Sequence, residues 1–156
     1  MNTVQVRSQL DSCNAQIAQY QNQARQYQSL LSEALSRQGY LQQQLAKARV
    51  VQDRCEGLRQ PFARYDDAAN AYGMALGAAM GCQNEVMNAF GRIRGDDYGQ
   101  IQNIIREADA LVERLSQELA TVAAQADQYR QQAAAAQNNA QRSANNARAL
   151  RSQLYA

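Results

Sequence analysis

Residues 101–154 read IQNIIREADALVERLSQELATVAAQADQYRQQAAAAQNNAQRSANNARALRSQL. Mostly apolar or small side chains return here in alternating steps of four and three residues, at Ile101, Ile105, Ala108, Val112, Leu115, Leu119, Val122, Ala126, Tyr129, Ala133, Ala136, Ala140, Ser143, Ala147, Leu150 and Leu154. This heptad spacing places one stripe along a helix, and the stripe requires a second helix to cover it.

A second heptad repeat occupies the first third of the chain. Its positions are Val6, Leu10, Cys13, Ile17, Tyr20, Ala24, Tyr27, Leu31, Ala34, Gln38, Leu41, Leu45, Ala48, Gln52 and Cys55. We call the positions of both repeats the seam. Two such repeats in one chain predict helices that pair with each other. We therefore predict an all-α fold, an elongated antiparallel helical hairpin or coiled coil, as one domain of residues 1–156.

The composition agrees with long helices and gives little sign of a ligand. The chain has one Pro, no Trp and no His, and its formal net charge is +2. A near-neutral charge does not indicate a nucleic-acid partner. We expect no cofactor.

The middle of the chain interrupts the heptads. Gln60-Pro61 ends the first helix, because Pro lacks the backbone N–H and restricts the residue before it. Asp96 and Asp97 are typical of a helix start. We therefore predict helices over about 2–59 and 97–155. Between them we predict a shorter middle helical segment over about 62–93, with a weak point near residues 77–81.

Charge and side-chain size favour the antiparallel direction. Residues 34–60 hold five basic and two acidic side chains, and residues 96–127 hold seven acidic and two basic ones. An antiparallel hairpin brings these stretches together. If Gly57 lies near Asp97, Tyr20 faces residues 133–136 and Tyr27 falls near residue 126, so that large side chains meet small ones.

Gly73, Gly77 and Gly81 lie four residues apart within an apolar stretch, and such a ladder lets a second helix approach closely. That helix can be the chain's own hairpin or a partner. For a partner, the expected contacts are the three glycines with Met74, Met80 and Phe90. A membrane-active alternative uses residues 68–82, but this stretch is shorter than the ~20 residues of a bilayer span. We expect no stable membrane span.

The sequence gives no sign of catalysis or of a metal site. The absence of His removes the commonest general base. The pairs Asp66-Asp67 and Asp96-Asp97 are adjacent in sequence and do not predict carboxylates that face each other across a cleft. The spacing of Cys13, Cys55 and Cys82 fits no zinc site. We interpret the three as reduced thiols and the chain as a non-enzyme.

The arrangement of a long polar helix, a glycine-containing interruption and a second amphipathic helix resembles the ESX-type (WXG superfamily) helical hairpins. It is similar in particular to the small partner proteins of LXG effectors in type VII secretion. Phe62-Ala-Arg-Tyr-Asp66 resembles the Phe-x-x-x-Asp form of that family's secretion signal, although it lies in the middle of this chain. Asn88-Ala-Phe90-Gly91 stands where the family has Trp-x-Gly, and this chain has no Trp.

The resemblance implies a non-catalytic secretion partner that pairs with the helical domain of an effector. The alternatives are a structural coiled-coil spacer or assembly protein that associates with itself, and a membrane-active helical protein. We expect a cytoplasmic protein, because no signal peptide precedes the first heptad. The resemblance also implies that the protein can be exported without a cleaved signal peptide. An apolar strip left uncovered after the two repeats have paired would favour the partner hypothesis.

Overall fold

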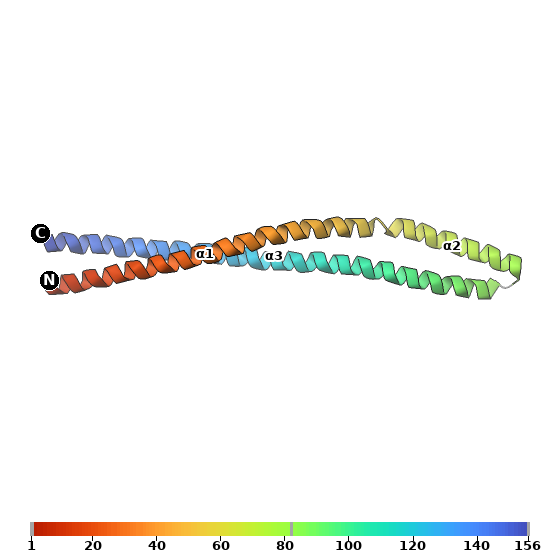
Figure 1. The fold of residues 1–156 in the computed structure, drawn as a ribbon, viewed down its shortest axis with the longest axis horizontal. Helices are drawn as coiled ribbons and strands as arrows, with labels where there is room; N and C mark the ends of the chain where they lie inside the picture. The colour runs from red at the N-terminus through yellow and green to blue at the C-terminus, as the bar shows by residue number, and fades with distance from the viewer. Residues whose placement is uncertain (1, 82, 156) are drawn as a thin grey trace. The chain divides into compact units, whose positions relative to one another are not determined.

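The fold is that of a computed structural model, which describes residues 2–81 and 83–155. It also describes their side chains, except those of Met80, Gln83, Val86, Phe90, Ile93 and Arg94. The described residues form three helices in the order α1 (Thr3–Glu56), α2 (Arg59–Met80) and α3 (Gln83–Tyr155). The predicted all-α class is confirmed (Figure 1).

A capping box starts α1. The Val4 backbone N–H donates to Oδ1 of Asn2 at 3.4 Å. The Asn2 backbone N–H donates in turn to Oε1 of Gln5, also at 3.4 Å. Each side chain thus satisfies a backbone donor that the first helical turn leaves without a partner. This local chemistry sets the start of a helix that then continues for 54 residues.

The break between α1 and α2 is short. The Gly57 N–H donates to the carbonyl of Asp53 at 3.0 Å, and the Leu58 N–H to the carbonyl of Cys55 at 3.1 Å. The last turn of α1 therefore tightens at Leu58 before α2 begins at Arg59. Pro61 lies in the first turn of α2, where its missing N–H costs no hydrogen bond.

The turn between α2 and α3 lies at Gly81, which differs from the predicted end of the middle helix near residue 93. Gly81 has φ +70° and ψ +15°, a left-handed conformation that Gly adopts without a steric penalty. Its N–H is directed at the carbonyls of Ala78 and Gly77 and caps α2. Asp96 and Asp97 lie inside α3 and do not begin it. The helix-start signal of Asp96 and Asp97 therefore has no effect here, because the chain has already turned at Gly81 and α3 runs through both residues.

Contacts between residues group the chain into two compact units. One domain of residues 1–156 stays a prediction. Unit 1 is Met1–Tyr40 with Leu119–Ala156, and unit 2 is Leu41–Glu118. In unit 1 the start of α1 packs antiparallel to the end of α3 (Figure 1). The fully buried seam of unit 1 is built almost entirely of small side chains, namely Val6, Ala24, Ala34, Ala126, Ala133, Ala136, Ser143 and Ala147.

Unit 2 contains the end of α1, all of α2 and the start of α3. Its buried positions include larger side chains, and the buried hydrophobic residues among those described are Leu41, Leu45, Ala48, Cys55, Ile105 and Ala108. Cys55, Ile105 and Ala108 form one cluster, against which Ile101 packs. Every seam position, in unit 1 and in unit 2, is buried or half-buried. The heptad prediction is therefore confirmed at each position.

The antiparallel direction is confirmed, but the register differs from the predicted one. In unit 1 the Ser143 hydroxyl donates to Oε1 of Gln16 at 3.4 Å. In unit 2 the Gln52 amide donates to Oδ1 of Asp109 at 2.8 Å. These pairs are offset by about one heptad from the predicted pairing of Gly57 with Asp97. A seven-residue slip keeps every seam position on the seam, so the heptads alone cannot exclude it.

Candidate functional site

The predicted glycine ladder divides between two roles. Gly73 and Gly77 are buried in unit 2, whereas Gly81 is exposed and forms the cap of α2. Burial within a single chain corresponds to the packing alternative for Gly73 and Gly77, in which the glycines allow close approach inside the hairpin. A role of these glycines in binding a partner stays a prediction.

The other predicted partner contacts are placed in part. Met74 lies on α2 with 48% of its surface exposed. The side chains of Met80 and Phe90 lie outside the described residues. Of the predicted set, Met74 therefore offers a large apolar side chain that a partner could reach.

Phe62 and Asp66, the two residues that resemble a secretion signal, lie one turn apart on α2 and are both half-buried. The Phe62 ring stacks on Tyr98 of α3, with centroids 5.6 Å apart and an interplanar angle of 29°. It also contacts Tyr65, at a centroid distance of 6.0 Å. Phe62 thus joins α2 to α3, and the motif is part of the packed hairpin.

Phe62 and Asp66 border a hollow of about 220 Å³ between α2 and α3, which we call the aromatic hollow. Its lining consists of Arg59, Phe62, Ala63, Asp66, Asp67, Tyr98, Ile101, Gln102 and Ile105. Rings and aliphatic side chains form one part of this lining, and two carboxylates form another. The arrangement suits a ligand group with an apolar stem and a positive charge.

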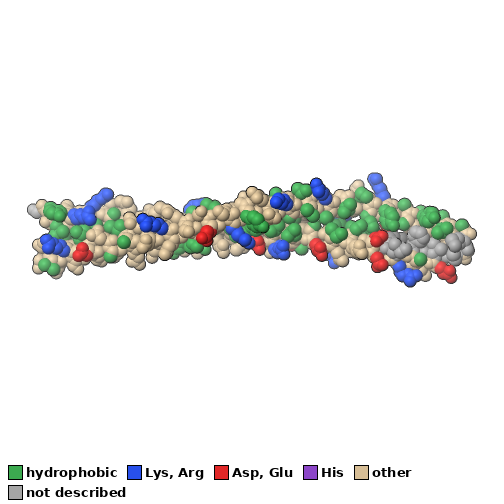
Figure 2. Space-filling model, viewed as in Figure 1, with side chains coloured by type: hydrophobic (Ala, Val, Ile, Leu, Met, Phe, Trp, Pro, Cys, Tyr) green, Lys and Arg blue, Asp and Glu red, His purple; other side chains and the backbone are tan. Residues whose placement is uncertain are grey.

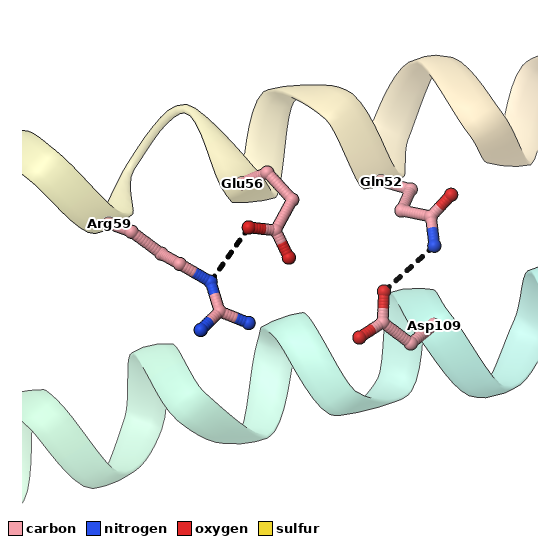
Figure 3. A network of polar contacts seen from close by, with 4 residues as sticks. All are labelled: Gln52, Glu56, Arg59 and Asp109. Carbon is pink, nitrogen blue, oxygen red and sulfur yellow. Dashed lines mark hydrogen bonds and ion pairs between the residues drawn. The ribbon is translucent and has the colours of Figure 1, made fainter.

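Polar contacts fix the α1 end of this region (Figure 3). Arg59 Nε lies 2.8 Å from Oε2 of Glu56, an ion pair across the break between α1 and α2. Gln52 reaches Asp109 on α3. Both ion-paired side chains are about half-exposed, so the ion pair orients Arg59 more than it stabilises the fold.

A second apolar surface was not predicted from the sequence. Val51, Leu58, Tyr65 and Tyr72 recur at intervals of seven residues along the end of α1 and along α2. Each has between 48% and 62% of its surface exposed. We call these four residues the outer stripe. Their constant spacing of seven residues could have predicted this surface. It is easily overlooked, because the spacing of Phe62, Tyr65, Ala69 and Tyr72 is also typical of a single helical face.

The outer stripe adjoins the aromatic hollow at Phe62, whose ring contacts Tyr65, and the rest of the hollow extends away from the stripe. Ala63 and Asp67 line the hollow, and each is two residues from Tyr65, which corresponds to about 160° around a helix. Figure 2 shows hydrophobic side chains gathered over α2 and the end of α1. Tyr65 and Tyr72 are each more than half-exposed on this flank of α2.

Sites for other chemistry are not found among the described residues. No group of three or more His, Cys, Asp or Glu side chains in the described part could hold a metal ion. Cys13 is half-buried and Cys55 is buried, both as free thiols, and Cys82 lies outside the described residues. Across residues 2–81 and 83–155, no helix has the length and apolarity needed to cross a membrane.

Comparison with known proteins gives no relative from which a function could be transferred. No protein-family model matches the chain. No curated protein sequence and no solved structure matches it either.

Proposed function

We propose that this chain is a non-catalytic helical binding protein, and that the outer stripe is the surface on which a helix of another protein packs. In its specific form the proposal is a secretion partner that pairs with the helical domain of an LXG-type effector. The specific form draws on the resemblance in hairpin pattern and on the Phe62–Asp66 motif. The general form draws on the surface of unit 2.

One observation carries the proposal. Both seams are already buried or half-buried inside the chain, and yet the outer stripe remains about half-exposed. A helix that pairs with one other helix needs only a narrow seam, whereas a helix in a larger bundle has a wider apolar arc. Residues 68–80 of α2 also contain no charged side chain. This exposed apolar surface supports the view that α2 packs against a further helix.

Self-association is the competing function, because a second copy could cover the same stripe. The structural spacer hypothesis expects the heptad repeats to be completed between copies. Here the repeats are covered within each unit of one chain, which favours a foreign helix on the stripe. The size of the helical partner is open to experiment, since a single helix and a helical hairpin would both satisfy one stripe.

The test uses a double variant, Tyr65→Lys with Tyr72→Lys, against a matched control, Ala71→Lys with Ala78→Lys. Both variants add two charges to exposed positions of α2, but Ala71 and Ala78 lie off the stripe. Each purified chain is titrated by calorimetry with the helical N-terminal domain of an LXG-type effector. We expect the stripe variant to bind at least ~30-fold more weakly, since buried Tyr residues often dominate an interface.

Equal binding by the stripe variant and the unsubstituted chain would refute the outer stripe as the partner surface. A Met74→Lys variant tests the earlier prediction for the opposite flank of α2. Loss of binding in that variant alone would move the partner surface to Met74. Absence of any complex, with all chains folded by circular dichroism, would refute the effector partner.

A further inference from the structure

The aromatic hollow has a negative balance of charge. Among the described residues that line it, Arg59 is the one cation, and the carboxylate of Glu56 lies 2.8 Å from it. Asp66 and Asp67 supply two carboxylates on the same side of α2. Asp66 also takes part in an interaction within the chain, so Asp67 is the more accessible acid. The hollow therefore attracts a cation.

The rings define the second requirement on an occupant. Tyr98 stacks on Phe62 and still has half of its own surface exposed. An Arg guanidinium binds favourably over such a ring and pairs with a carboxylate beside it. An aromatic side chain on the occupant could also stack at this site. The hollow thus suits a helical segment that presents Arg and an aromatic ring on one face.

The end of α3 presents such a face in this same chain. Arg148, Arg151 and Tyr155 are spaced by three and four residues, which places them on one side of the helix. All three are exposed, and 90% of the surface of Tyr155 is accessible to solvent. No acidic residue occurs in residues 128–156, which hold four Arg. We call Arg148, Arg151 and Tyr155 the basic face.

The two units also differ in net charge. The segments of unit 1 contain seven basic and three acidic side chains, a formal charge of +4. Unit 2 contains nine basic and eleven acidic side chains, a formal charge of −2. Unit 1 of one copy is therefore attracted to unit 2 of another. Complementary charges of this kind select a partner and its orientation.

We propose that the aromatic hollow of one copy binds the basic face of a second copy. Arg151 or Arg148 lies over the Tyr98 ring and pairs with Asp67, and Tyr155 packs on the aromatic lining. The contact joins two different surfaces, so each copy offers one hollow and one basic face. It is also smaller than the ~1,200 Å² typical of stable complexes, so the association is weak and sensitive to salt.

Sedimentation equilibrium of the full chain, from about 10 μM to about 1 mM, measures this association directly. The hollow variant is Asp67→Lys with Gln102→Lys, and the basic-face variant is Arg148→Glu with Arg151→Glu. We expect each to weaken self-association at least ~10-fold at about 0.02 M salt, with a much smaller difference at about 0.5 M. Asp96→Lys with Asp97→Lys is the matched control, because these exposed acids of α3 do not line the hollow.

A mixture of the two variants gives the sharpest test. The hollow variant keeps an intact basic face, and the basic-face variant keeps an intact hollow. Mixed in equal amounts, they should form a one-to-one complex at concentrations at which each variant alone stays largely monomeric. Circular dichroism of each chain confirms that helix content is unchanged.

Several results would overturn the proposal. These are an unsubstituted chain that stays monomeric up to about 1 mM, an equal loss in the control variant, or a mixture that stays monomeric. Hollow-dependent binding of a foreign basic helix by a monomeric chain would assign the site to another partner. The single variant Tyr72→Lys leaves the contact of Tyr65 with Phe62 intact and should self-associate normally, so failure of this proposal and failure of the effector partner are separate outcomes.

Discussion

Units 1 and 2 use the same heptad repeat with different side chains. Unit 1 buries chiefly Ala, whereas unit 2 buries Leu, Ile and Cys and adds a third helical segment. Small side chains allow two helices to approach closely but bury little apolar area per residue. Larger side chains bury more area. Unit 2 also contains the half-exposed outer stripe and the aromatic hollow. Both surfaces that we propose as acceptors of a helix, the outer stripe and the aromatic hollow, therefore lie in unit 2, whereas unit 1 supplies the basic face.

The register of unit 1 can be tested by a cross-link. The contact of Gln16 with Ser143 implies that Ala24 faces Ala136, and both are buried. In a chain without its native cysteines, Ala24→Cys with Ala136→Cys should form an intramolecular disulfide. Closing a loop of this length should stabilise the oxidised chain by up to about 4 kcal/mol, measured by urea unfolding with and without reductant.

The control is Ile17→Cys with Ala136→Cys, a pair that corresponds to the predicted pairing of Gly57 with Asp97 and lies one heptad away. This control should remain reduced or form links between chains. If it closes as readily as the first pair, the register of unit 1 is not unique, and the Ala seam allows the helices to slip.

The larger side chains of unit 2 should make its core the more sensitive one. Leu41 is the most buried of them, with 1% of its surface exposed. Leu41→Ala should lower the free energy of unfolding by about 3 kcal/mol, since the cavity has no replacement atoms to fill it. Leu35→Ala, at an exposed position of unit 1, is the control and should change stability by less than about 1 kcal/mol. Equal losses would contradict the difference between the units.

Larger side chains at the buried glycines of α2 should lower the stability of the chain. Gly77→Leu should lower the free energy of unfolding of the isolated chain by about 1–3 kcal/mol, because the added side chain overfills a close contact. Thermal and urea unfolding both report this. An isolated chain that is more stable, but binds no partner, would show instead that Gly77 serves an interface.

The smallest expected effect distinguishes open glycines from packed ones. A Cβ added at Gly39 of unit 1 or at Gly95 of unit 2 meets no atom within 4 Å. Gly39→Ala and Gly95→Ala should each stabilise the chain by up to about 1 kcal/mol through helix propensity. A loss of stability at either position, measured by thermal unfolding, would indicate a close neighbour at that site.

The sequence predicted the parts of this fold that repeat better than the turn: Gly81 lies in the weak point predicted near residues 77–81, but the middle helix was predicted to continue to about residue 93. The seam recurs at many positions, so its pattern withstands local exceptions such as Gln38 and Ser143. The turn depends on Gly81 alone, and Asp96 and Asp97 gave a competing signal that α3 overrides by continuing through them. The predicted register was wrong for the same reason. Pairings one heptad apart fit the seam equally well, so the position of the turn decides between them.

The candidate surfaces were predicted less well, for a physical reason. Phe62 and Asp66 were identified by their spacing, but the hollow beside them needs Tyr98, Ile101 and Ile105 from a helix far along the chain. A single sequence does not state which residues of two helices meet when the register is unknown. The outer stripe could have been predicted from the sequence, since its members are seven residues apart.

The short break at Gly57 and Leu58 limits how this chain can change in length. The outer stripe passes through it at a constant interval, with Val51 before the break, Leu58 in it and Tyr65 after it. One inserted residue there would turn everything beyond it by about 100°, separating the stripe and moving Gly73 and Gly77 off the side they now share. Seven inserted residues would restore the alignment. Relatives of this chain should therefore differ at this junction by multiples of seven, and gaps of other lengths should coincide with loss of the stripe.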